Sequence, residues 1–261
     1  MRFDLSRSDH RIQLCGDLHF EVVERRIPGA PAFLRGLRVL FITDTHVAPR
    51  TTREHLAAFT EKLAACRPSL VLWGGDFADK AGDAVRLFEA LSGLAPTLGS
   101  FGVVGNNDRQ AWPDIDELRS AMRKAGIRLL LNESLALDTD GGKLIIAGVD
   151  EYRYGEPDAC GLYPEEASPG CYRLLLSHYP ILPPQKPDLM LSGHTHGGQF
   201  DLMGITPYTI GFERKIQRLN GPMHVSGLSP DGRVLTSSGI GASRLPLRIG
   251  VRPEVELLTF G

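Results

Sequence analysis

The stretch that decides the fold is Leu40-Phe41-Ile42-Thr43-Asp44-Thr45-His46. Its apolar start predicts a buried β-strand, and Asp44 and His46, two metal-binding residue types, follow at once. Four further segments repeat this design: Leu70-Val71-Leu72-Trp73 before Gly75-Asp76, Phe101-Gly102-Val103-Val104 before Gly105-Asn106-Asn107-Asp108, Leu174-Leu175-Leu176 before Ser177-His178, and Leu189-Met190-Leu191 before Gly193-His194-Thr195-His196. Carboxylates, an amide and imidazoles are therefore expected where strands end, which is the layout of a dinuclear metal centre on the rim of a sheet.

Helical patterns separate the first three of these segments. One helix is expected after Thr51-x-x-Glu54, which matches a capping box, and it ends by Pro68. A second is expected around residues 85–91. A third begins at Asp114-x-x-Glu117 and stops at Gly126, a residue that tolerates the left-handed conformation common at helix ends.

The second half of the chain is mostly strand. Short β-like runs cover residues 127–131, 143–147, 173–176, 189–191, 223–226, 233–236 and 255–260. Alternating strands and helices followed by a strand-rich half predict an α/β (α+β) fold with two packed, mixed β-sheets and helices outside. We expect one domain. Residues 1–36 form an N-terminal β arm of it, with an edge strand from Phe20 to Ile27, and residues 37–261 carry the five motifs.

Composition narrows the class of protein. The 261 residues carry a net charge of -2, so they lack the basic surplus that binding to extended nucleic acid usually requires. The four cysteines are scattered without a C-x-x-C pair and are expected to be reduced thiols. The first residues never form a continuous apolar stretch, so neither a signal peptide nor a membrane span is expected. A soluble cytoplasmic enzyme is the resulting prediction, and the oligomeric state is left open.

Seven side chains at the strand ends suffice for two metal ions. The assignment gives Asp44, His46 and His196 to one metal, Asn106, His178 and His194 to the other, and Asp76 to both as a bridge. Oxygen and nitrogen ligands without sulfur favour two divalent ions from the set Mn²⁺, Fe²⁺/Fe³⁺ or Zn²⁺. Such a pair lowers the pKa of a bridging water to roughly 7, which predicts in-line attack on phosphorus by a bridging hydroxide.

In this order, D-x-H, G-D, G-N-x-D, H and G-H-T-H resemble the calcineurin-like metallophosphoesterase superfamily. The resemblance runs from about Leu37 to the C-terminus, and Leu191 to Gln199, Ser238 to Gly241 and Pro246 to Ile249 are similar to its bacterial phosphodiesterase-type branch. It implies a four-layer sandwich of two sheets flanked by helices. It also implies the same seven metal ligands: Asp44, His46, Asp76, Asn106, His178, His194 and His196.

One departure from the family pattern bears on catalysis. Most members have G-N-H-D or G-N-H-E where this chain has Gly105-Asn106-Asn107-Asp108, so Asn107 replaces the histidine credited with stabilising the transition state or protonating the leaving group. Asparagine donates a hydrogen bond but is no general acid near pH 7. We therefore expect a bias toward phosphodiesters or pyrophosphates. Asp108 is predicted to orient its neighbours. Arg109 is a candidate phosphate contact, with an exposed arginine satisfied by solvent as the alternative.

A second departure concerns Asp79-Lys80, where protein serine/threonine phosphatases carry Asp-Arg-Gly, so protein phosphatase activity is not expected. The predicted substrate is a phosphate-containing small molecule, a nucleotide or a lipid-linked pyrophosphate. Two alternatives stay open: a phosphomonoesterase, and a catalytically weak or inactive metal-binding scaffold of the same fold.

Several residues receive a weaker prediction. Asp17-Leu18-His19 is a second D-x-H, but no apolar strand precedes it, so we interpret it as a solvated turn. His224 is expected at the surface. The irregular stretch from Asp150 to Gly170 contains Tyr152, Tyr154 and Tyr163, which are candidates for lining a substrate cleft.

Overall fold

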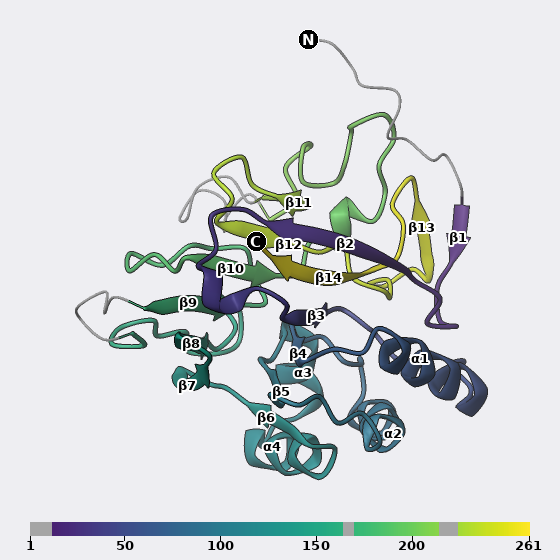
Figure 1. The fold of residues 1–261 in the computed structure, drawn as a ribbon. Coiled ribbons are helices and arrows are strands. Elements are labelled where there is room, and N and C mark those ends of the chain that lie inside the picture. The colour runs from purple at the N-terminus through teal and green to yellow at the C-terminus, as the bar shows by residue number, and fades with distance from the viewer. Residues whose placement is uncertain (1–11, 164–169, 214–223) are drawn as a thin grey trace.

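Two six-stranded sheets form the centre of the computed structural model, which describes residues 12–163, 170–213 and 224–261 (Figure 1). The first sheet has the order β2 (Glu21–Ile27), β14 (Glu254–Phe260), β3 (Arg38–Ile42), β4 (Leu70–Trp73), β5 (Ser100–Gly102) and β6 (Ile127–Leu129). The second has the order β11 (Gly227–Leu228), β12 (Val234–Thr236), β10 (Leu189–Ser192), β9 (Cys171–Leu176), β8 (Gly142–Gly148) and β7 (Glu133–Thr139). A separate ribbon pairs β1 (Ile12–Leu14) with β13 (Leu247–Ile249).

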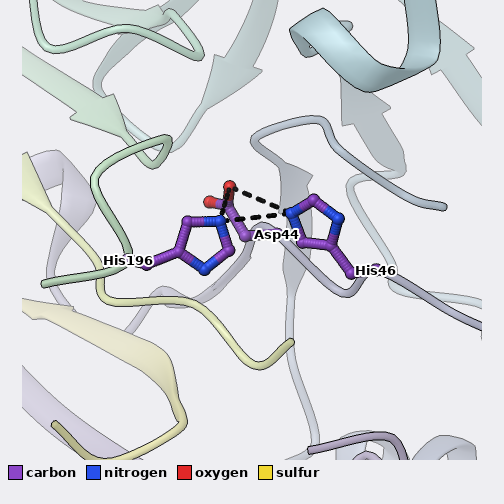
Figure 2. Close-up of side chains that lie close together, drawn as sticks. All are labelled: Asp44, His46 and His196. Carbon is purple, nitrogen blue, oxygen red and sulfur yellow. Dashed lines mark hydrogen bonds and ion pairs between the residues drawn. The ribbon is translucent and has the colours of Figure 1, made fainter. Parts of the chain in front are cut away.

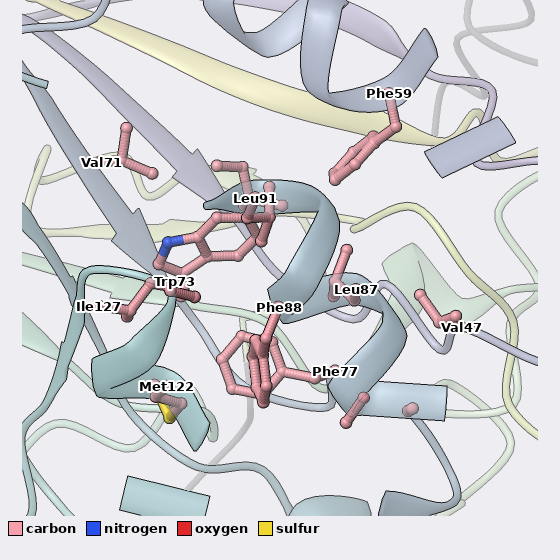
Figure 3. Close-up of a cluster of buried hydrophobic side chains, with 14 of the residues drawn as sticks. Val47, Phe59, Val71, Trp73, Phe77, Leu87, Phe88, Leu91, Met122 and Ile127 are labelled. Atoms are coloured by element: carbon pink, nitrogen blue, oxygen red, sulfur yellow. The ribbon is translucent and has the colours of Figure 1, made fainter. Parts of the chain in front are cut away.

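Helices cover one face of the first sheet, on the side away from the second (Figure 1). They are α1 (Arg53–Ala65), α2 (Ala81–Leu91) and α4 (Ile115–Lys124), and the short α3 (Asn106–Ala111) leads from β5 toward α4. Trp73, Phe77 and Phe88 pack together under these helices (Figure 3). A second apolar cluster, which includes Phe41 and Leu174, fills the space between the sheets. The fold is thus the expected one, with two packed mixed sheets flanked by helices.

The direction of the strands brings the motifs to one edge of each sheet. In the first sheet β3, β4, β5 and β6 are parallel neighbours, and in the second β8, β9, β10 and β12 are. Both faces of β3, β4 and β10 are covered, which explains why these strands are continuous apolar runs without alternation. All five motifs follow the carboxyl ends of such parallel strands.

The predicted helices around residues 85–91 and from Asp114 to Gly126 are confirmed, and the Asp114 side chain caps α4 by accepting from the Asp116 N–H. The first helix begins one residue later than expected. Its cap is Thr52, whose hydroxyl accepts from His55 N, so the prediction of a Thr51–Glu54 capping box is wrong. The Thr51 hydroxyl instead accepts from Ala48 N over 3.2 Å and donates to Gly16 O in the N-terminal arm over 2.8 Å, so it does not cap the helix.

Several elements differ from the sequence prediction, among them β1 and β13, which were not predicted. Helix α3 starts at Asn106 itself, inside the third motif, and its six residues are too few to give a helical period. Strand β7 was not predicted. The strand expected over 223–226 is wrong for residues 224–226, which lie in a loop before β11, while Met223 lies outside the described residues. Gly227, the first residue of β11, has a φ of +80°, a conformation that glycine adopts readily.

Candidate metal centre

Asp44, His46 and His196 point toward one another at the edge of the two sheets (Figure 2). The Asp44 Oδ1 atom lies 3.3 Å from His196 Nε2 and 3.9 Å from His46 Nε2, and the two Nε2 atoms are 3.2 Å apart. All three residues are buried. Residues 150 positions apart in the chain thus offer one carboxylate and two imidazoles to a common point.

A second group adjoins the first. His178 Nε2 lies 3.4 Å from Asp76 Oδ2 and 4.0 Å from Asp44 Oδ1, and His46 Nε2 lies 3.5 Å from the same Asp76 oxygen. His194 Nδ1 is 3.3 Å from His178 Nε2 and 3.0 Å from Asn106 Oδ1. The structure therefore brings all seven predicted ligands together, with Asp76 between the two groups.

The hydrogen bonding of the buried Asp44 carboxylate bears on metal binding. Asp44 Oδ2 accepts hydrogen bonds from Thr43 Oγ1 and His194 N, but Asp44 Oδ1 is buried without a hydrogen-bond partner among the described residues. A buried carboxylate oxygen left without a donor costs free energy, and a cation would satisfy it. Together with the nitrogen and oxygen donors around it, this atom shows that the residues fit a divalent metal.

Comparison with known proteins gives this geometry a family. The family model for calcineurin-like phosphoesterases matches residues 37–198, which include all seven residues. The chain belongs to this family. It is 31% identical to the uncharacterized protein YpbG of Bacillus subtilis, over 86% of this chain and 81% of that protein. It is also 27% identical to the phosphodiesterase YaeI of Escherichia coli, over 92% of this chain and 87% of that protein.

As a member of this family, the protein is a metal-dependent phosphoesterase. It is a hydrolase that acts on phosphoester bonds, and its substrate is a phosphate ester. The membership agrees with the resemblance seen in the sequence, including the phosphodiesterase branch. None of the helices in the described parts of the chain has the length and apolar character needed to cross a bilayer.

The charged groups of the centre shift one another's pKa values. Burial alone would lower the pKa of His178, but the carboxylates of Asp76 and Asp44 outweigh it and raise the pKa to about 10. Burial would raise the pKa of Asp76, yet the charges of His178 and His46 hold it well below its usual value. Burial, helped by the charges of His46 and Arg248, lowers the pKa of His196. A proton on His178 Nε2 would balance the carboxylates here, and a metal bound at that nitrogen would displace it.

Backbone conformation sets the directions of the ligands. Twelve described non-glycine residues have positive φ, and five of them are proposed ligands: Asp44, His46, Asp76, His194 and His196. Such residues cost of order 1–3 kcal/mol each and tend to gather at functional sites. Close packing also requires glycine, because a Cβ on Gly105 would lie 2.0 Å from Asp76 Oδ1 and one on Gly193 2.2 Å from Asp44 Oδ2.

The two residues after Asn106 hold the central carboxylate. Asn107 donates to both oxygens of Asp76, from its backbone N–H over 2.8 Å and from Nδ2 over 3.0 Å. The buried carboxyl of Asp108 accepts from the N–H groups of Asp76, Phe77 and Gly105 at 2.7–2.9 Å. Burial and the charge of Asp76 raise the pKa of Asp108 to about 7. Asp108 therefore orients the turn that carries Asp76.

Arg109 does not lie where it could contact a phosphate in the cavity. Its Nε donates to Asp150 Oδ1 over 2.9 Å, a second donor reaches Asp150 Oδ2, and the side chain is not among those that line the cavity. The same Asp150 carboxylate accepts from the N–H groups of Glu151 and Glu156. In this structure Arg109 anchors the loop that follows β8.

A cavity of about 440 Å³ opens over the centre. Asp76, Asn106, Asn107, His194 and His196 form its polar floor. Its walls carry two arginines, Arg153 and Arg244, and the apolar side chains of Tyr154, Phe200, Tyr208, Phe212 and Leu245. Of the three loop tyrosines, Tyr154 lines this cavity, whereas Tyr152 packs against Tyr179 and Tyr163 is buried against the second sheet.

Sequence reasoning missed several residues that contact the ligands. Asp79 Oδ1 lies 2.9 Å from His46 Nδ1, Glu213 Oε2 lies 2.7 Å from His194 Nε2, and the buried Arg248 lies 3.2 Å from His196 Nδ1. Two of them had a signal: Asp79 matches the aspartate of the phosphatase Asp-Arg-Gly segment, and Arg248 falls in the Pro246–Ile249 stretch that resembles the branch. Arg153, Arg244 and Glu213 occur in irregular segments without any periodicity.

The structure also describes the second D-x-H segment and His224. Asp17 and His19 are exposed, and Asp17 Oδ1 accepts from the His19 backbone N–H, so the second D-x-H is the expected turn. His224 is half-buried, with Nδ1 3.3 Å from Thr236 Oγ1, and burial lowers its pKa. It is therefore not the surface histidine that the sequence suggested.

Proposed function

We propose that this enzyme hydrolyses phosphodiester or pyrophosphate bonds with two divalent metal ions, Mn²⁺, Fe²⁺/Fe³⁺ or Zn²⁺. The observation that carries the proposal is the position of Asp76, whose Oδ2 lies within 3.5 Å of both His46 and His178. Asp44, His46 and His196 would hold one ion, Asn106, His178 and His194 the other, and Asp76 both. When bound, such a pair supplies an acidified water as nucleophile and accepts charge from the phosphoryl oxygens.

Asn107 decides which leaving groups the enzyme tolerates. Its amide lines the cavity beside Asp76 and can donate a hydrogen bond to a phosphoryl or leaving-group oxygen, but it cannot transfer a proton. Alkoxide leaving groups with a high pKa need that proton, whereas phosphorylated or aryl leaving groups do not. This favours pyrophosphates and activated diesters over simple alkyl phosphomonoesters, the activity that the phosphomonoesterase alternative requires.

Arg153 and Arg244 take the phosphate-binding role that the sequence gave to Arg109. Both line the cavity and both are exposed, so their guanidinium groups are available to an incoming anion. Arginine binds phosphate oxygens in a bidentate manner. The apolar wall next to them suits a substrate that joins phosphate to a flat or aliphatic group, such as a nucleotide or a lipid-linked pyrophosphate.

The compartment proposed is the cytoplasm. The four cysteines are free thiols, and Cys160 is exposed to solvent. Free, exposed thiols are typical of proteins that function in a reducing environment.

Hydrolysis of bis-p-nitrophenyl phosphate with Mn²⁺ tests the proposal, with Asp76→Ala as the inactivating variant. We expect metal-dependent turnover that falls at least about 100-fold in Asp76→Ala, since its carboxylate serves both metal positions. Asp17→Ala is the matched control, because it removes the aspartate of the solvent-exposed D-x-H and should retain full activity. A wild-type protein that hydrolyses neither diesters nor pyrophosphates with any of these metals would favour the inactive scaffold instead.

A further inference from the structure

The buried carboxylate of Glu213 reaches the proposed centre from a segment that no motif marks. Its Oε2 lies 2.7 Å from His194 Nε2, and only 8% of its side chain is exposed. Glu213 also lines the cavity, and its Oε1 is 3.9 Å from Arg153 Nη1 in the loop that follows β8. A carboxylate this close to an imidazole accepts the ring's N–H, because an ionised carboxylate has no proton to donate.

Stacking against Tyr179 does not determine which way round the His194 ring lies. Tyr179 stacks on the ring with centroids 3.7 Å apart and an interplanar angle of 26°. Stacking fixes the plane of an imidazole but is almost unchanged when the ring turns over by 180°. Only one of these two orientations points Nδ1 at Asn106 Oδ1 and His178 Nε2, the atoms around the second metal position.

Glu213 distinguishes the two orientations. It accepts from Nε2–H, which places the proton on Nε2 and leaves the lone pair of Nδ1 free to bind a metal. A hydrogen-bond acceptor on the second ring nitrogen is the common way in which proteins fix a metal-binding histidine. His178 achieves the same with Gly74 O, 2.8 Å from its Nδ1, and His46 with Asp79.

We propose that Glu213 is the positioning residue for His194, holding it in the orientation and tautomer that bind the second metal ion. This inference rests on the proposed two-metal function and adds to it a residue outside all five motifs. It follows that the segment from Phe200 to Glu213, which walls the cavity with Tyr208 and Phe212, also determines whether the second metal position is complete.

Titration of the metal-free protein with Mn²⁺ tests this, with the number and affinity of bound ions measured by calorimetry and the paired-ion signal by electron paramagnetic resonance. We expect Glu213→Ala to weaken binding of the second ion about 10- to 100-fold, to leave the first unchanged and to remove the paired signal at Mn²⁺ concentrations that just saturate wild type. Glu213→Gln keeps an acceptor oxygen of similar reach and should restore binding to within about tenfold of wild type. Glu156→Ala, which removes an exposed carboxylate from the loop that follows β8, is the matched control and should bind Mn²⁺ as wild type does.

The outcomes separate this inference from the function on which it rests. Two ions bound by wild type and by Glu213→Ala with equal affinities would overturn the positioning role alone. A wild-type protein that binds fewer than two ions would overturn the two-metal function, and the positioning role with it. If Glu213→Ala does not fold, equal second-ion affinity in Glu213→Gln and in the variant Glu213→Leu would likewise overturn the role, because leucine offers no acceptor.

Discussion

At the scale of single residues, Asn107 is the position where chemistry and family pattern diverge. Replacing it by histidine would supply the general acid that this chain lacks, within reach of the cavity floor. We expect Asn107→His to raise the rate of alkyl phosphomonoester hydrolysis by about 10- to 100-fold relative to p-nitrophenyl phosphate and bis-p-nitrophenyl phosphate, because the p-nitrophenolate leaving group of these two needs no proton. Steady-state kinetics on the three substrates measures this. Equal changes on all three would show that Asn107 does not determine the preference.

The residues that the sequence could reveal are those whose chemistry is paired with a strand end. Asp44, Asp76 and His178 each follow an apolar run, and the structure brings them together. Glu213 and Arg153 could not be predicted, because they reach the centre from irregular segments whose path depends on tertiary packing. The left-handed backbone of five proposed ligands could not be predicted either, because aspartate and histidine, although enriched among non-glycine residues with positive φ, adopt it in only a small fraction of cases.

At the scale of elements, the ion pair between Arg109 in α3 and Asp150 after β8 connects the two sheets' loops. Asp150 is buried, so losing its partner leaves a buried charge. We expect Arg109→Met to destabilise the protein by roughly 2–4 kcal/mol while changing KM for a diester less than about threefold. Urea denaturation and kinetics measure the two effects. Arg153→Met is the counterpart, with little loss of stability and a raised KM; the reverse pattern would return the phosphate contact to Arg109.

The pairing of β2 with β14 contains a pH-sensitive contact. Burial raises the pKa of Glu256, Glu254 adds to the effect, and Arg25 offsets only part of it, so the pKa is about 7. The ordinary value is 4.5, so the stability linked to this group is complete below about pH 4.5 and is lost as pH rises through 7. We expect Glu256→Gln to be more stable than wild type at pH 8, by on the order of 2 kcal/mol, and to show no gain at pH 4.5. Chemical denaturation at both pH values measures this, and a gain independent of pH would contradict it.

Element boundaries show where sequence patterns stop being informative. The strand of the N-terminal arm was predictable because its alternation survives at a sheet edge, where β2 pairs with β14 over seven residues. We propose on this basis that the arm belongs to the same domain as residues 37–261. Helix α3 was not predictable, because its six residues are set by the turn that Asp108 holds rather than by an apolar face.

At the scale of the whole molecule, the architecture followed from the order of strands and helices, while the location of the centre followed from strand direction. Asp44 and Asp76 follow strands of the first sheet, and His178 and His194 follow strands of the second, so the proposed centre lies where the edges of two sheets meet. Sequence could indicate the two sheets but not their relative placement, because the apolar residues between them, such as Phe41 and Leu174, fit many packings.

A metal centre that joins two sheets should also stabilise them. Ions that bind the folded chain alone add about 2.7 kcal/mol per site at one hundred times the dissociation constant, which for two sites corresponds to a rise in Tm of roughly 10 °C in a chain of this size. We expect Mn²⁺ to raise the Tm by about that amount and a chelator to reverse it. Asp76→Ala, which removes the shared carboxylate, should lose most of the increase, and Asp17→Ala none. Differential scanning calorimetry measures all four, and an unchanged Tm in saturating metal would mean that these side chains do not bind ions between the sheets.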